Sequence, residues 1–374
     1  MNIAIDATRA ITEQAGIGRY TRELIKKLLQ IDKKNQYLLI FTYFRGDSRK
    51  KRLIESFRRP NTITKVLKIP GNLKEKIWTW RISWLNLFLG KTDVFYAPSF
   101  LEVNLGLKIP QVVTIYDMST FLFPEHRGVK ISEKLNLRTR LACQKAKKII
   151  AISGSTKKDL QEILKIKENK IQMIYPGPTE FAQIASKLPN NLKAGNYLLS
   201  VGTIEPRKNL IGLFKAYALL PPNVQEKFPL VVVGAQGWQT GEIFTVFRAL
   251  KLESKVKLLG FVPDAVLAKL YKEAKIFIYP SFYEGFGFPV LEALNFSTPV
   301  ITSDTSSLPE VAEKAAILID PKNPLELSSG MMRLLEHQNA REELVRFAKK
   351  QAQKFSWDKA ARETLKVFEE ILNK

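Results

Sequence analysis

The sequence predicts an α/β protein built from two doubly wound, Rossmann-like domains. Short runs rich in valine, isoleucine and tyrosine alternate with amphipathic stretches of helical length, which is typical of strand–helix units around a parallel sheet. These runs form two sets, each large enough for one sheet, and a polar stretch separates them. The length of 374 residues also indicates two domains rather than one.

Thirteen runs have the length and composition of strands. In the front half they lie at 3–6, 37–42, 63–67, 94–97, 112–116, 149–152 and 172–175. In the back half they lie at 197–202, 230–234, 256–260, 276–280, 300–302 and 317–320. Helices are expected at 19–29, 78–88, 132–147, 156–164 and 358–372. Thr156 and Asp159 would form a capping box for the fourth of these helices.

A hinge is predicted between the two sets of strands. Pro176, Gly177 and Pro178 are followed by a polar stretch at 186–196, and residues of these kinds favour turns over regular elements. We therefore expect an N-terminal domain over 1–185 and a C-terminal domain over 186–356. The tail over 357–374 has apolar residues at helical spacing, so it is expected to pack back on the N-terminal domain as a helix.

Composition excludes several kinds of site. Cys143 is the single cysteine, which excludes an internal disulfide framework, a cysteine zinc site and a dithiol redox pair. The chain has two histidines, His126 and His337, so histidine-rich metal sites are excluded as well. The N-terminus lacks the pattern of a secretory signal, and the most apolar segment, at 77–89, is shorter than the roughly 20 residues of a membrane span. We therefore expect a cytoplasmic protein.

The net charge of +23 lies mostly in the front half. Residues 1–180 hold 34 lysines and arginines against 16 acidic residues, a balance of +18, whereas 181–374 hold 25 against 20, a balance of +5. This asymmetry indicates an anionic partner, either a membrane surface or a nucleic acid, with simple solvation as the alternative. The chain contains no recognised nucleic-acid-binding motif, so a nucleic acid is not the expected partner.

A membrane surface would suit the basic front half. The cations that would attract anionic lipids are Arg45, Arg49, Lys50, Lys51, Arg52, Arg58 and Arg59. Trp78, Trp80, Trp84 and Phe88 follow them and would embed at the interface, unless their helical spacing places them in the core instead. The expected location is therefore cytoplasmic and peripheral, on the inner face of the cell membrane.

Two glycines, Gly16 and Gly18, lie in the loop after the first strand, at the start of the next helix. Glycines there allow backbone N–H groups to approach an anion, and the helix N-terminus adds its dipole. A plain turn between a strand and a helix is the alternative.

A second motif occupies 202–210, after the first strand of the C-terminal domain. Arg207 and Lys208 stand at the carboxyl end of that strand, before a helix that Asn209 could cap. Two adjacent cations at the ligand-binding edge of an α/β sheet form a forked site for a diphosphate. The alternative is a pair of solvated surface cations.

The most specific motif occupies 281–294. Glu284 and Glu292 have seven residues between them, with a Gly-x-Gly turn in the gap and Pro289 as the expected first helical residue. Glu284, on the loop, is placed to accept hydrogen bonds from sugar hydroxyls, while the loop N–H groups point at a ligand. Glu292, one turn into the helix, is set to hold two vicinal ribose hydroxyls, as acidic residues do in dinucleotide sites.

Together these residues resemble the retaining nucleotide-sugar glycosyltransferases of the GT-B fold, in the group 1 class known as glycosyltransferase family four. The resemblance covers nearly the whole chain and includes the stretches 306–310 and 320–321. It implies an acceptor-binding N-terminal domain and a C-terminal domain that binds the nucleotide-sugar donor. No cofactor is implied. No metal is expected either, because the protein's own cations would neutralise the diphosphate.

The resemblance also implies roles for single residues. Arg207 and Lys208 would bind the diphosphate, and Glu292 the ribose. The base would lie near Gly234 and 261–262. The implied donor-binding set is Gly16, Gly18, Glu205, Arg207, Lys208, Gly234, Val262, Glu284, Gly285, Phe286, Gly287, Phe288, Leu291 and Glu292. The implied catalytic set is Glu284, Arg207, Lys208, Tyr116 and Asp117.

Tyr116 marks a departure from the family pattern. Many members have a His-Asp pair where this chain has Tyr116-Asp117, and the family places that histidine beside the 6-hydroxyl and the anomeric centre of the sugar. The tyrosine could still donate a hydrogen bond, so the departure bears on the sugar more than on the reaction. His126 is expected at the surface, with a place near the acceptor as the alternative.

The expected activity is transfer of a hexose, mannose or glucose, from a nucleotide-diphosphate sugar to a glycan or lipid-linked acceptor in cell-surface polysaccharide synthesis, such as that of lipopolysaccharide. The expected mechanism is metal-independent front-side substitution with retention. The departing diphosphate would accept the proton of the acceptor. Two alternatives stay open: a nucleotide-sugar epimerase of the same fold, and a basic nucleic-acid-binding protein.

Overall fold

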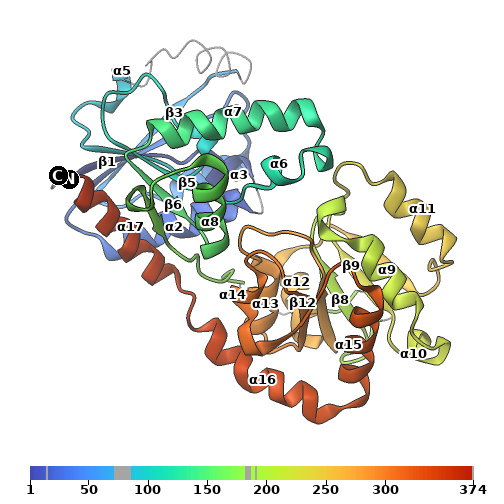
Figure 1. The fold of residues 1–374 in the computed structure, drawn as a ribbon. Helices are drawn as coiled ribbons and strands as arrows, with labels where there is room; N and C mark the ends of the chain where they lie inside the picture. The colour runs from blue at the N-terminus through green and yellow to red at the C-terminus, as the bar shows by residue number, and fades with distance from the viewer. Residues whose placement is uncertain (14–15, 71–85, 182–186, 190–191, 373–374) are drawn as a thin grey trace. The chain divides into compact units, whose positions relative to one another are not determined.

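A computed structural model of the chain describes residues 1–13, 16–70, 86–181, 187–189 and 192–372 (Figure 1). These residues form two compact units, each built around one parallel sheet. The first unit comprises Met1–Phe121, Glu133–Gly177 and Ser356–Lys374, and the second comprises Leu122–Ser132 and Pro178–Phe355.

The sheet of the first unit has seven parallel strands in the order β3-β2-β1-β4-β5-β6-β7. In chain order they are β1 (Asn2–Asp6), β2 (Gln36–Thr42), β3 (Thr62–Leu67), β4 (Val94–Ala97), β5 (Gln111–Ile115), β6 (Lys148–Ala151) and β7 (Ile171–Met173). The strand order reverses between β1 and β4, which pair with Ile3 opposite Val94. Strands β4 and β5 are buried along their whole length, as expected for a parallel sheet covered on both faces.

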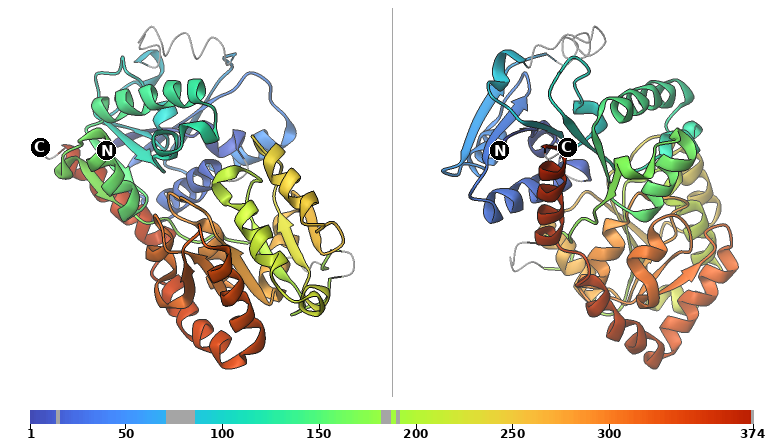
Figure 2. Two further views of the ribbon diagram at one scale, coloured as in Figure 1. Left: turned by 45° about the vertical axis from the view of Figure 1, so that its right-hand side comes forward. Right: turned by 60° about the vertical axis from the view of Figure 1, so that its left-hand side comes forward.

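Helices cover this sheet. They are α1 (Thr8–Thr12), α2 (Ile17–Ile31), α3 (Ser48–Glu55), α5 (Asn86–Leu89), α6 (Ser119–Leu122), α7 (Val129–Lys145), α8 (Gly154–Leu164) and α17 (Trp357–Leu372), with short 3-10 turns η1 (Phe100–Glu102) and η3 (Glu168–Lys170). The C-terminal helix α17 lies along α2, as Figures 1 and 2 show. Lys27 Nζ lies 3.2 Å from the Asp358 carboxylate, and Tyr20 packs edge-on against Trp357. The tail is therefore a structural part of the first unit.

The sheet of the second unit has six parallel strands in the order β10-β9-β8-β11-β12-β13. They are β8 (Leu198–Val201), β9 (Leu230–Val233), β10 (Val256–Gly260), β11 (Ile276–Tyr279), β12 (Val300–Ser303) and β13 (Ala316–Ile319). The helices are α9 (Leu210–Ala218), α10 (Pro222–Lys227), α11 (Gly241–Ala249), α12 (Asp264–Glu273), α13 (Phe288–Asn295), α14 (Leu308–Ala312), α15 (Pro324–Glu336) and α16 (Gln338–Ala352). Short 3-10 turns are η2 (Pro124–His126), η4 (Pro206–Lys208) and η5 (Glu313–Ala315). The strand order reverses between β8 and β11.

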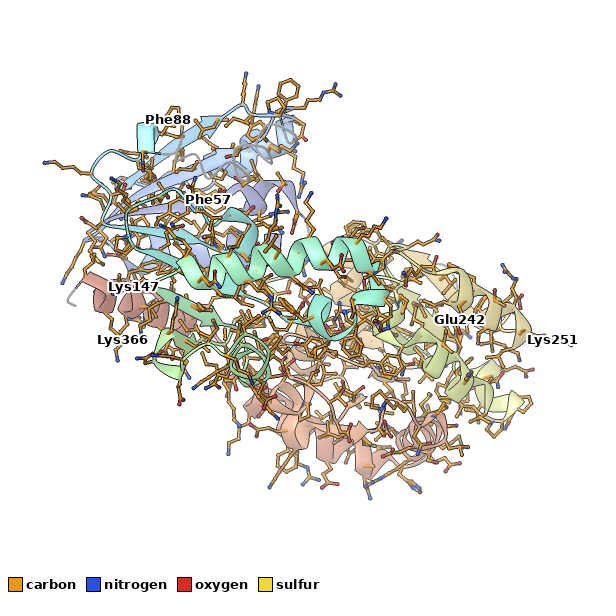
Figure 3. The ribbon with its side chains drawn as sticks, turned by 45° about the horizontal axis from the view of Figure 1, so that its top comes forward. Phe57, Phe88, Lys147, Glu242, Lys251 and Lys366 are labelled. Carbon is orange, nitrogen blue, oxygen red and sulfur yellow. The ribbon has the colours of Figure 1, made fainter. Side chains whose placement is uncertain are left out.

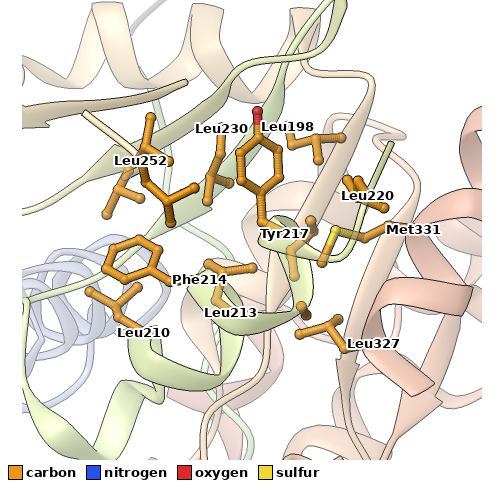
Figure 4. Packing of buried hydrophobic residues seen from close by; sticks show 14 of the residues in the cluster. Leu198, Leu210, Leu213, Phe214, Tyr217, Leu220, Leu230, Leu252, Leu327 and Met331 are labelled. Carbon is orange, nitrogen blue, oxygen red and sulfur yellow. The ribbon is translucent and has the colours of Figure 1, made fainter. Parts of the chain in front are cut away.

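Each unit has its own apolar core. In the second unit, Phe214 and Tyr217 of α9 pack with Leu198 of the sheet and Met331 of α15 (Figure 4). In the first unit, a separate cluster joins the sheet to α7 and α8. Figure 3 shows how the side chains radiate from both units, with Lys147 and Lys366 projecting outward from the first. Among the described helices, none has the length and apolar character needed to cross a bilayer.

The α/β class and the two parallel sheets are confirmed, and every expected strand is present to within about two residues at its ends. The expected capping box of α8 is wrong. Ser153 is the N-cap and accepts a hydrogen bond from Thr156 N, because the helix begins at Gly154, earlier than predicted. Of the expected helix at 78–88, the part up to 85, with all three of its tryptophans, lies outside the described residues, and α5 begins at Asn86.

The structure also divides the chain differently from the predicted boundaries at 185 and 356. The segment Leu122–Ser132 belongs to the second unit although it lies far upstream in the sequence. Its Phe123 ring packs 5.8 Å from the Tyr283 ring, and Gln239 Nε2 donates a hydrogen bond to Glu125 O. The crossing from the first unit to the second falls between Gly177 and Pro178, and residues 182–186, around the predicted boundary, lie outside the described part of the chain.

Candidate active site

The candidate site lies at the carboxyl ends of β8 and β11 in the second unit. These two strands flank the point where the strand order reverses, and doubly wound α/β proteins bind their ligands in the crevice at such a point. Arg207 and Lys208 lie in the turn η4 that follows β8, and Glu284 lies in the loop that follows β11. The topology therefore brings together two motifs that are more than 70 residues apart in the sequence.

Arg207 joins the two loops. Its guanidinium donates hydrogen bonds to Glu284 Oε2 at 2.9 Å, to Glu205 Oε1 at 2.6 Å and to the carbonyl oxygen of Tyr283 at 2.8 Å. The Glu205 and Glu284 side chains are nearly inaccessible, whereas that of Arg207 keeps 18% of its surface exposed. Protein acceptors thus hold the guanidinium in place, while part of the Arg207 side chain stays accessible to solvent.

Lys208 forms a closed triangle with Tyr279 and Glu284. Its Nζ donates to Glu284 Oε1 at 2.6 Å and to the Tyr279 hydroxyl oxygen at 2.7 Å, and that hydroxyl donates to Glu284 Oε1 at 2.9 Å. Charge-assisted hydrogen bonds of this kind are the strong ones in proteins. The triangle fixes both the cation and the carboxylate at the sheet edge.

Burial and charge act in opposite directions on these groups. Burial by itself would raise the pKa of Glu284, but the adjacent Arg207 and Lys208 lower this pKa to about 2. Burial, reinforced by the charge of Arg207, lowers the pKa of Lys208. Burial, reinforced by the charge of Glu284, raises the pKa of Tyr279 well above its ordinary value. Glu284 is therefore a carboxylate at neutral pH, and Tyr279 is a neutral hydrogen-bond donor.

Hydroxyl and amide groups hold the two loops in place. Ser306 Oγ accepts from Glu284 N, and Ser307 Oγ donates to Glu284 O, both at 2.9 Å. Asn209 caps α9 through Gly212 N, as expected from the sequence, and its Nδ2 donates to the carbonyl oxygens of Pro280 and Pro321, which follow β11 and β13. The candidate site therefore stands on a preorganised frame rather than on free loops.

Glycines let two strand ends meet beside these loops. Gly234 has φ of 153°, and a Cβ there would lie 1.9 Å from the carbonyl oxygen of Gly202. A side chain at this position is therefore sterically excluded, which explains the glycine without any ligand.

Val262, after β10, is half-buried. Its neighbour Phe261 is one of the most exposed large apolar residues described, at 64%.

Glu292 lies in the second turn of α13 and is buried, with 4% of its surface exposed. The Tyr271 hydroxyl donates to its Oε2 at 2.8 Å, and the Thr179 hydroxyl donates to its Oε1. Glu292 thus contacts neutral hydroxyl groups, whereas Glu284 contacts two cations. The two glutamates of the motif have different chemical surroundings, which suits two different roles.

The turn between the two glutamates starts α13. Gly287 is the residue before the helix, and its φ of 102° lies in the region that favours glycine. The helix begins at Phe288, so Pro289 is its second residue rather than its first. Phe286 and Leu291 have buried side chains, so contacts of these two residues with a donor would have to come from their backbone groups. Gly285 precedes Phe286 on the same loop.

The first unit holds the other predicted residues. The Tyr116 hydroxyl donates to Pro98 O at 2.7 Å within the core, and Thr156 Oγ1 donates to Tyr116 O at 2.9 Å. Asp117 Oδ1 accepts hydrogen bonds from the backbone and the hydroxyl of Ser119 at the start of α6. Because its proton has an internal acceptor, Tyr116 is a structural residue in this arrangement, and its catalytic role stays a prediction.

Gly16 and Gly18 lie at the start of α2. Gly16 precedes the helix with φ of 53°, and Gly18 is the second helical residue. A Cβ on Gly18 would lie 2.3 Å from Glu13 O, so packing within the first unit already requires this glycine. The phosphate role of the pair stays a prediction.

His126 is partly exposed and packs against an aromatic neighbour. It lies on the segment that joins the second unit, where its ring stacks on Phe123 at 5.1 Å between centroids, and 22% of its side chain is exposed. Beside it, the Arg127 guanidinium lies 4.9 Å from the centre of the Trp238 ring. His126 is therefore a partly exposed residue that packs against its neighbours.

Sequence reasoning missed Tyr279, Tyr271 and Thr179. Tyr279 ends β11 at the strand-order reversal, so the rule that located Arg207 and Lys208 could have found it. Thr179 is 113 residues from its partner Glu292, and no local pattern connects the two. Within the described ranges, no group of three or more His, Cys, Asp or Glu side chains is placed to hold a metal ion.

Comparisons with known proteins agree with this architecture. A family model described as "Glycosyl transferases group 1" matches residues 183–351, and one described as "Glycosyltransferase Family 4" matches 15–178. The chain is 28% identical to O-antigen chain mannosyltransferase B of Escherichia coli, over 94% of this chain and 95% of that protein. It is 26% identical to O-antigen chain mannosyltransferase RfbU of Salmonella typhimurium, over 70% of this chain and 71% of that protein.

A solved structure shows the same fold. The sucrose-phosphate synthase of Thermosynechococcus elongatus superposes with a TM-score of 0.78, over 100% of this chain and 99% of that one, at 18% identity.

Proposed function

Because the chain belongs to the group 1 glycosyltransferases of family four and has the GT-B fold, we propose that it transfers mannose from a nucleoside diphosphate with retention of configuration. That it is a nucleotide-sugar dependent hexosyltransferase follows from both family models and the similar mannosyltransferases. Mannose as the sugar and a growing O-antigen-like glycan as the acceptor are proposed from the names of two relatives that align over most of the chain. The same likeness to transferases does not favour an epimerase.

One observation carries the assignment of the donor site. Arg207 and Lys208 converge on Glu284 and Tyr279 at the point where the strand order of the second sheet reverses. The diphosphate of the donor would bind at Arg207 and Lys208, and the sugar would lie toward Glu284. The ribose would lie at Glu292, whose carboxylate accepts hydrogen bonds from the hydroxyl groups of Tyr271 and Thr179.

The proposed chemistry depends on charge stabilisation. As the bond between the sugar and the phosphate breaks, negative charge grows on the departing diphosphate, and two preorganised cations stabilise it. Glu284, with a pKa of about 2, is a weak base that does not readily take a proton from the acceptor hydroxyl. The departing phosphate would therefore accept the proton of the acceptor hydroxyl on the same face, which gives retention. Because Arg207 and Lys208 would neutralise the charge of the departing diphosphate, the proposed reaction does not need a metal ion.

The first unit fits an acceptor at an anionic membrane surface. Its edge strand β3 and the residues around α3 carry exposed apolar side chains, with Phe44 at 58% and Ile63 at 60% exposure. Exposed cations lie close to them in the sequence, including Lys51 and Arg52 of α3. Cations together with exposed apolar groups favour binding to anionic lipid.

A donor panel tests the proposal. The full chain would be incubated with GDP-mannose, UDP-glucose and UDP-galactose, each with and without a mannose-terminated glycan acceptor. We expect transfer from GDP-mannose, an α-linked product by NMR, and unchanged rates in EDTA. A β-linked product would contradict retention, and conversion of a donor to its epimer without an acceptor would support an epimerase instead.

A further inference from the structure

The first unit carries an ion pair at its own strand-order reversal, between β1 and β4. Arg9 lies in α1, which follows β1, and Glu102 ends the turn η1, which follows β4. Arg9 Nε donates to Glu102 Oε1 at 2.9 Å, across 93 residues of sequence. Doubly wound sheets bind ligands at the carboxyl ends of their strands at such a point, so the pair marks a second candidate site.

Glu13 places a second carboxylate beside Arg9. Arg9 Nη1 donates to Glu13 Oε1. Glu13 directly follows α1, where its backbone N–H donates to Arg9 O at 3.2 Å, and its carbonyl oxygen accepts from Arg22 of α2. A Cβ on Gly18 would lie 2.3 Å from the same carbonyl oxygen. The backbone that carries the Glu13 carboxylate is therefore fixed between α1 and α2.

Arg9 keeps hydrogen-bonding capacity after these two contacts. A guanidinium has five N–H donors on three nitrogens. The two contacts use Nε and Nη1, and within the described ranges Nη2 donates to no protein acceptor. The side chain of Arg9 is 25% exposed and that of Glu13 is 33% exposed, whereas that of Glu102 is buried. A partly accessible guanidinium and a partly accessible carboxylate therefore lie side by side.

The accessible charges differ from those of the proposed donor site. There the carboxylates are nearly inaccessible, and Arg207 and Lys208 keep more of their side-chain surface, so the accessible charge is mainly positive. In the first unit the carboxylate of Glu13 is more accessible than its cation. A phosphate there would be attracted by Arg9 and repelled by Glu13. A sugar hydroxyl both donates and accepts, so two neighbouring hydroxyls satisfy the guanidinium and the carboxylate together.

We propose that Arg9 and Glu13 bind neighbouring hydroxyls of the acceptor glycan, with Glu102 as the positioning residue that holds the Arg9 guanidinium. This inference rests on the proposed function, in which the acceptor is a glycan. The guanidinium donates through Nη2 to one hydroxyl oxygen, and the Glu13 carboxylate accepts from the other hydroxyl. The site therefore selects an uncharged sugar at the acceptor end over a phosphorylated one.

Acceptor kinetics test the role of Arg9. The full chain would transfer from GDP-mannose to a mannose-terminated oligosaccharide, and KM would be measured separately for each substrate. We expect Arg9→Met to raise the acceptor KM about tenfold or more, the scale for a hydrogen bond to a charged group. The KM of GDP-mannose should stay near wild type, because Arg9 does not belong to the proposed donor site. Lys157→Met, which breaks an ion pair with Glu168 in the first unit, is the matched control and should leave both constants unchanged.

Glu13→Gln tests selectivity and not affinity alone. The change removes the negative charge and keeps the size of the side chain and an accepting oxygen. We expect the wild-type protein to use the neutral oligosaccharide about tenfold better, in kcat/KM, than the same oligosaccharide ending in mannose 6-phosphate, because like charges that meet disfavour binding. In Glu13→Gln this ratio should fall to about threefold or less, because the repulsion is lost. Glu13 is partly exposed, so this variant decides the matter if Arg9→Met does not fold.

Two variants of Glu102 distinguish its positioning role from a structural one. Glu102→Gln keeps an oxygen that can accept from Arg9 Nε, so the acceptor KM should stay near wild type. Glu102→Leu removes that oxygen and should raise the acceptor KM as Arg9→Met does, without changing the KM of GDP-mannose. Equal acceptor KM values in the two variants would contradict the positioning role.

The outcomes separate this inference from the proposed function. A wild-type acceptor KM in Arg9→Met, or an unchanged phosphate ratio in Glu13→Gln, would overturn the inference and leave the glycan acceptor standing. An equal rise of both KM values in Arg9→Met would reduce Arg9 to a structural role and overturn it as well. If the wild-type protein transfers no mannose from GDP-mannose to the oligosaccharide, the proposed function itself fails, and the inference with it.

Discussion

Lys208 Nζ donates a 2.6 Å hydrogen bond to Glu284 Oε1, so the cation proposed for the diphosphate and the carboxylate proposed for the sugar neutralise each other before any donor binds. Arg207 forms the corresponding pair with Glu205 and a second contact with Glu284. The cluster has two positive and two negative charges and is neutral as a whole. The two carboxylates therefore offset the repulsion between the two cations, which acts together with burial to lower the pKa of Lys208.

Neutralising either cation should impair the chemical step. We expect Arg207→Met and Lys208→Met each to lower kcat about 10²-fold or more, the scale for loss of one donor that stabilises charge in a transition state. Steady-state kinetics with the preferred donor would measure this, with and without EDTA. Lys255→Met, which breaks an exposed pair with Glu226, is the control and should keep wild-type kcat. Strict dependence on added Mg²⁺ or Mn²⁺ would contradict the proposed role of the two cations.

Removing the Tyr279 hydroxyl should lower kcat less than removing the Lys208 cation. In Tyr279→Phe, Lys208 and Glu284 keep their direct ion pair, so we expect kcat to fall by about tenfold at most. The loss of a buried hydrogen-bonded hydroxyl should cost about 1 kcal/mol of unfolding free energy. Tyr197→Phe is the matched control, because the Tyr197 hydroxyl donates to Leu270 O in the same unit. It should have a similar effect on stability and none on kcat; an equal loss of kcat in both variants would show that Tyr279 acts only through the fold.

The ion pairs of Glu284 should make stability depend on pH in a defined window. Its pKa is about 2 in the folded protein against an ordinary value of 4.5, so the unfolded chain binds this proton more readily. The resulting stabilisation is fully present above pH 4.5 and is lost as the pH falls toward 2. The shift corresponds to roughly 3 kcal/mol at neutral pH.

Comparing the wild-type protein with Glu284→Gln isolates this contribution. Urea unfolding at several pH values should show a variant that is clearly less stable at pH 7, and the difference in unfolding free energy should shrink between pH 4.5 and pH 2. Glu313→Gln, which breaks an exposed pair with Lys354, is the control and should differ little from wild type at pH 7. A difference for Glu284→Gln that stays constant over this range would mean that its carboxyl group is not held ionised by Arg207 and Lys208.

Features of the site that depend on short runs of residues could be predicted from the sequence, whereas contacts between residues far apart in the chain could not. The strands at 276–280 and 197–202 were predictable from runs of β-branched and aromatic residues, and their carboxyl ends placed Glu284 and Arg207 at one sheet edge. The contact between Thr179 and Glu292 joins residues that are 113 positions apart, a separation that no spacing rule contains. The same holds for Leu122–Ser132, which joins the second unit through the packing of Phe123 and Tyr283.

Tyr116 shows a second limit of prediction from sequence, which concerns the contacts of a side chain. Its place after β5 was predictable from the sequence, but the direction of its side chain was not. The hydroxyl donates to Pro98 O, and the ring packs edge-on against Tyr20 with 5.1 Å between centroids. A motif position therefore predicts where a backbone lies more securely than what its side chain contacts, especially where the residue type departs from the family pattern.

The uneven charge of the chain leads to a last prediction, about membranes. If the first unit docks on anionic lipid, full-length protein should sediment with vesicles that contain phosphatidylglycerol and stay in the supernatant with purely neutral vesicles. Salt should release it as the Debye length falls below about 8 Å.

Lys51→Glu/Arg52→Glu, on the exposed side of α3, should weaken sedimentation several-fold. It should leave the thermal shift by the donor nucleotide unchanged, because these residues are not part of the donor site. Lys349→Glu/Lys350→Glu on α16 changes the net charge equally in the second unit and should leave sedimentation near wild type. Equal loss in both double variants would attribute vesicle binding to net charge alone, and equal binding to neutral vesicles would show that the basic excess serves solvation.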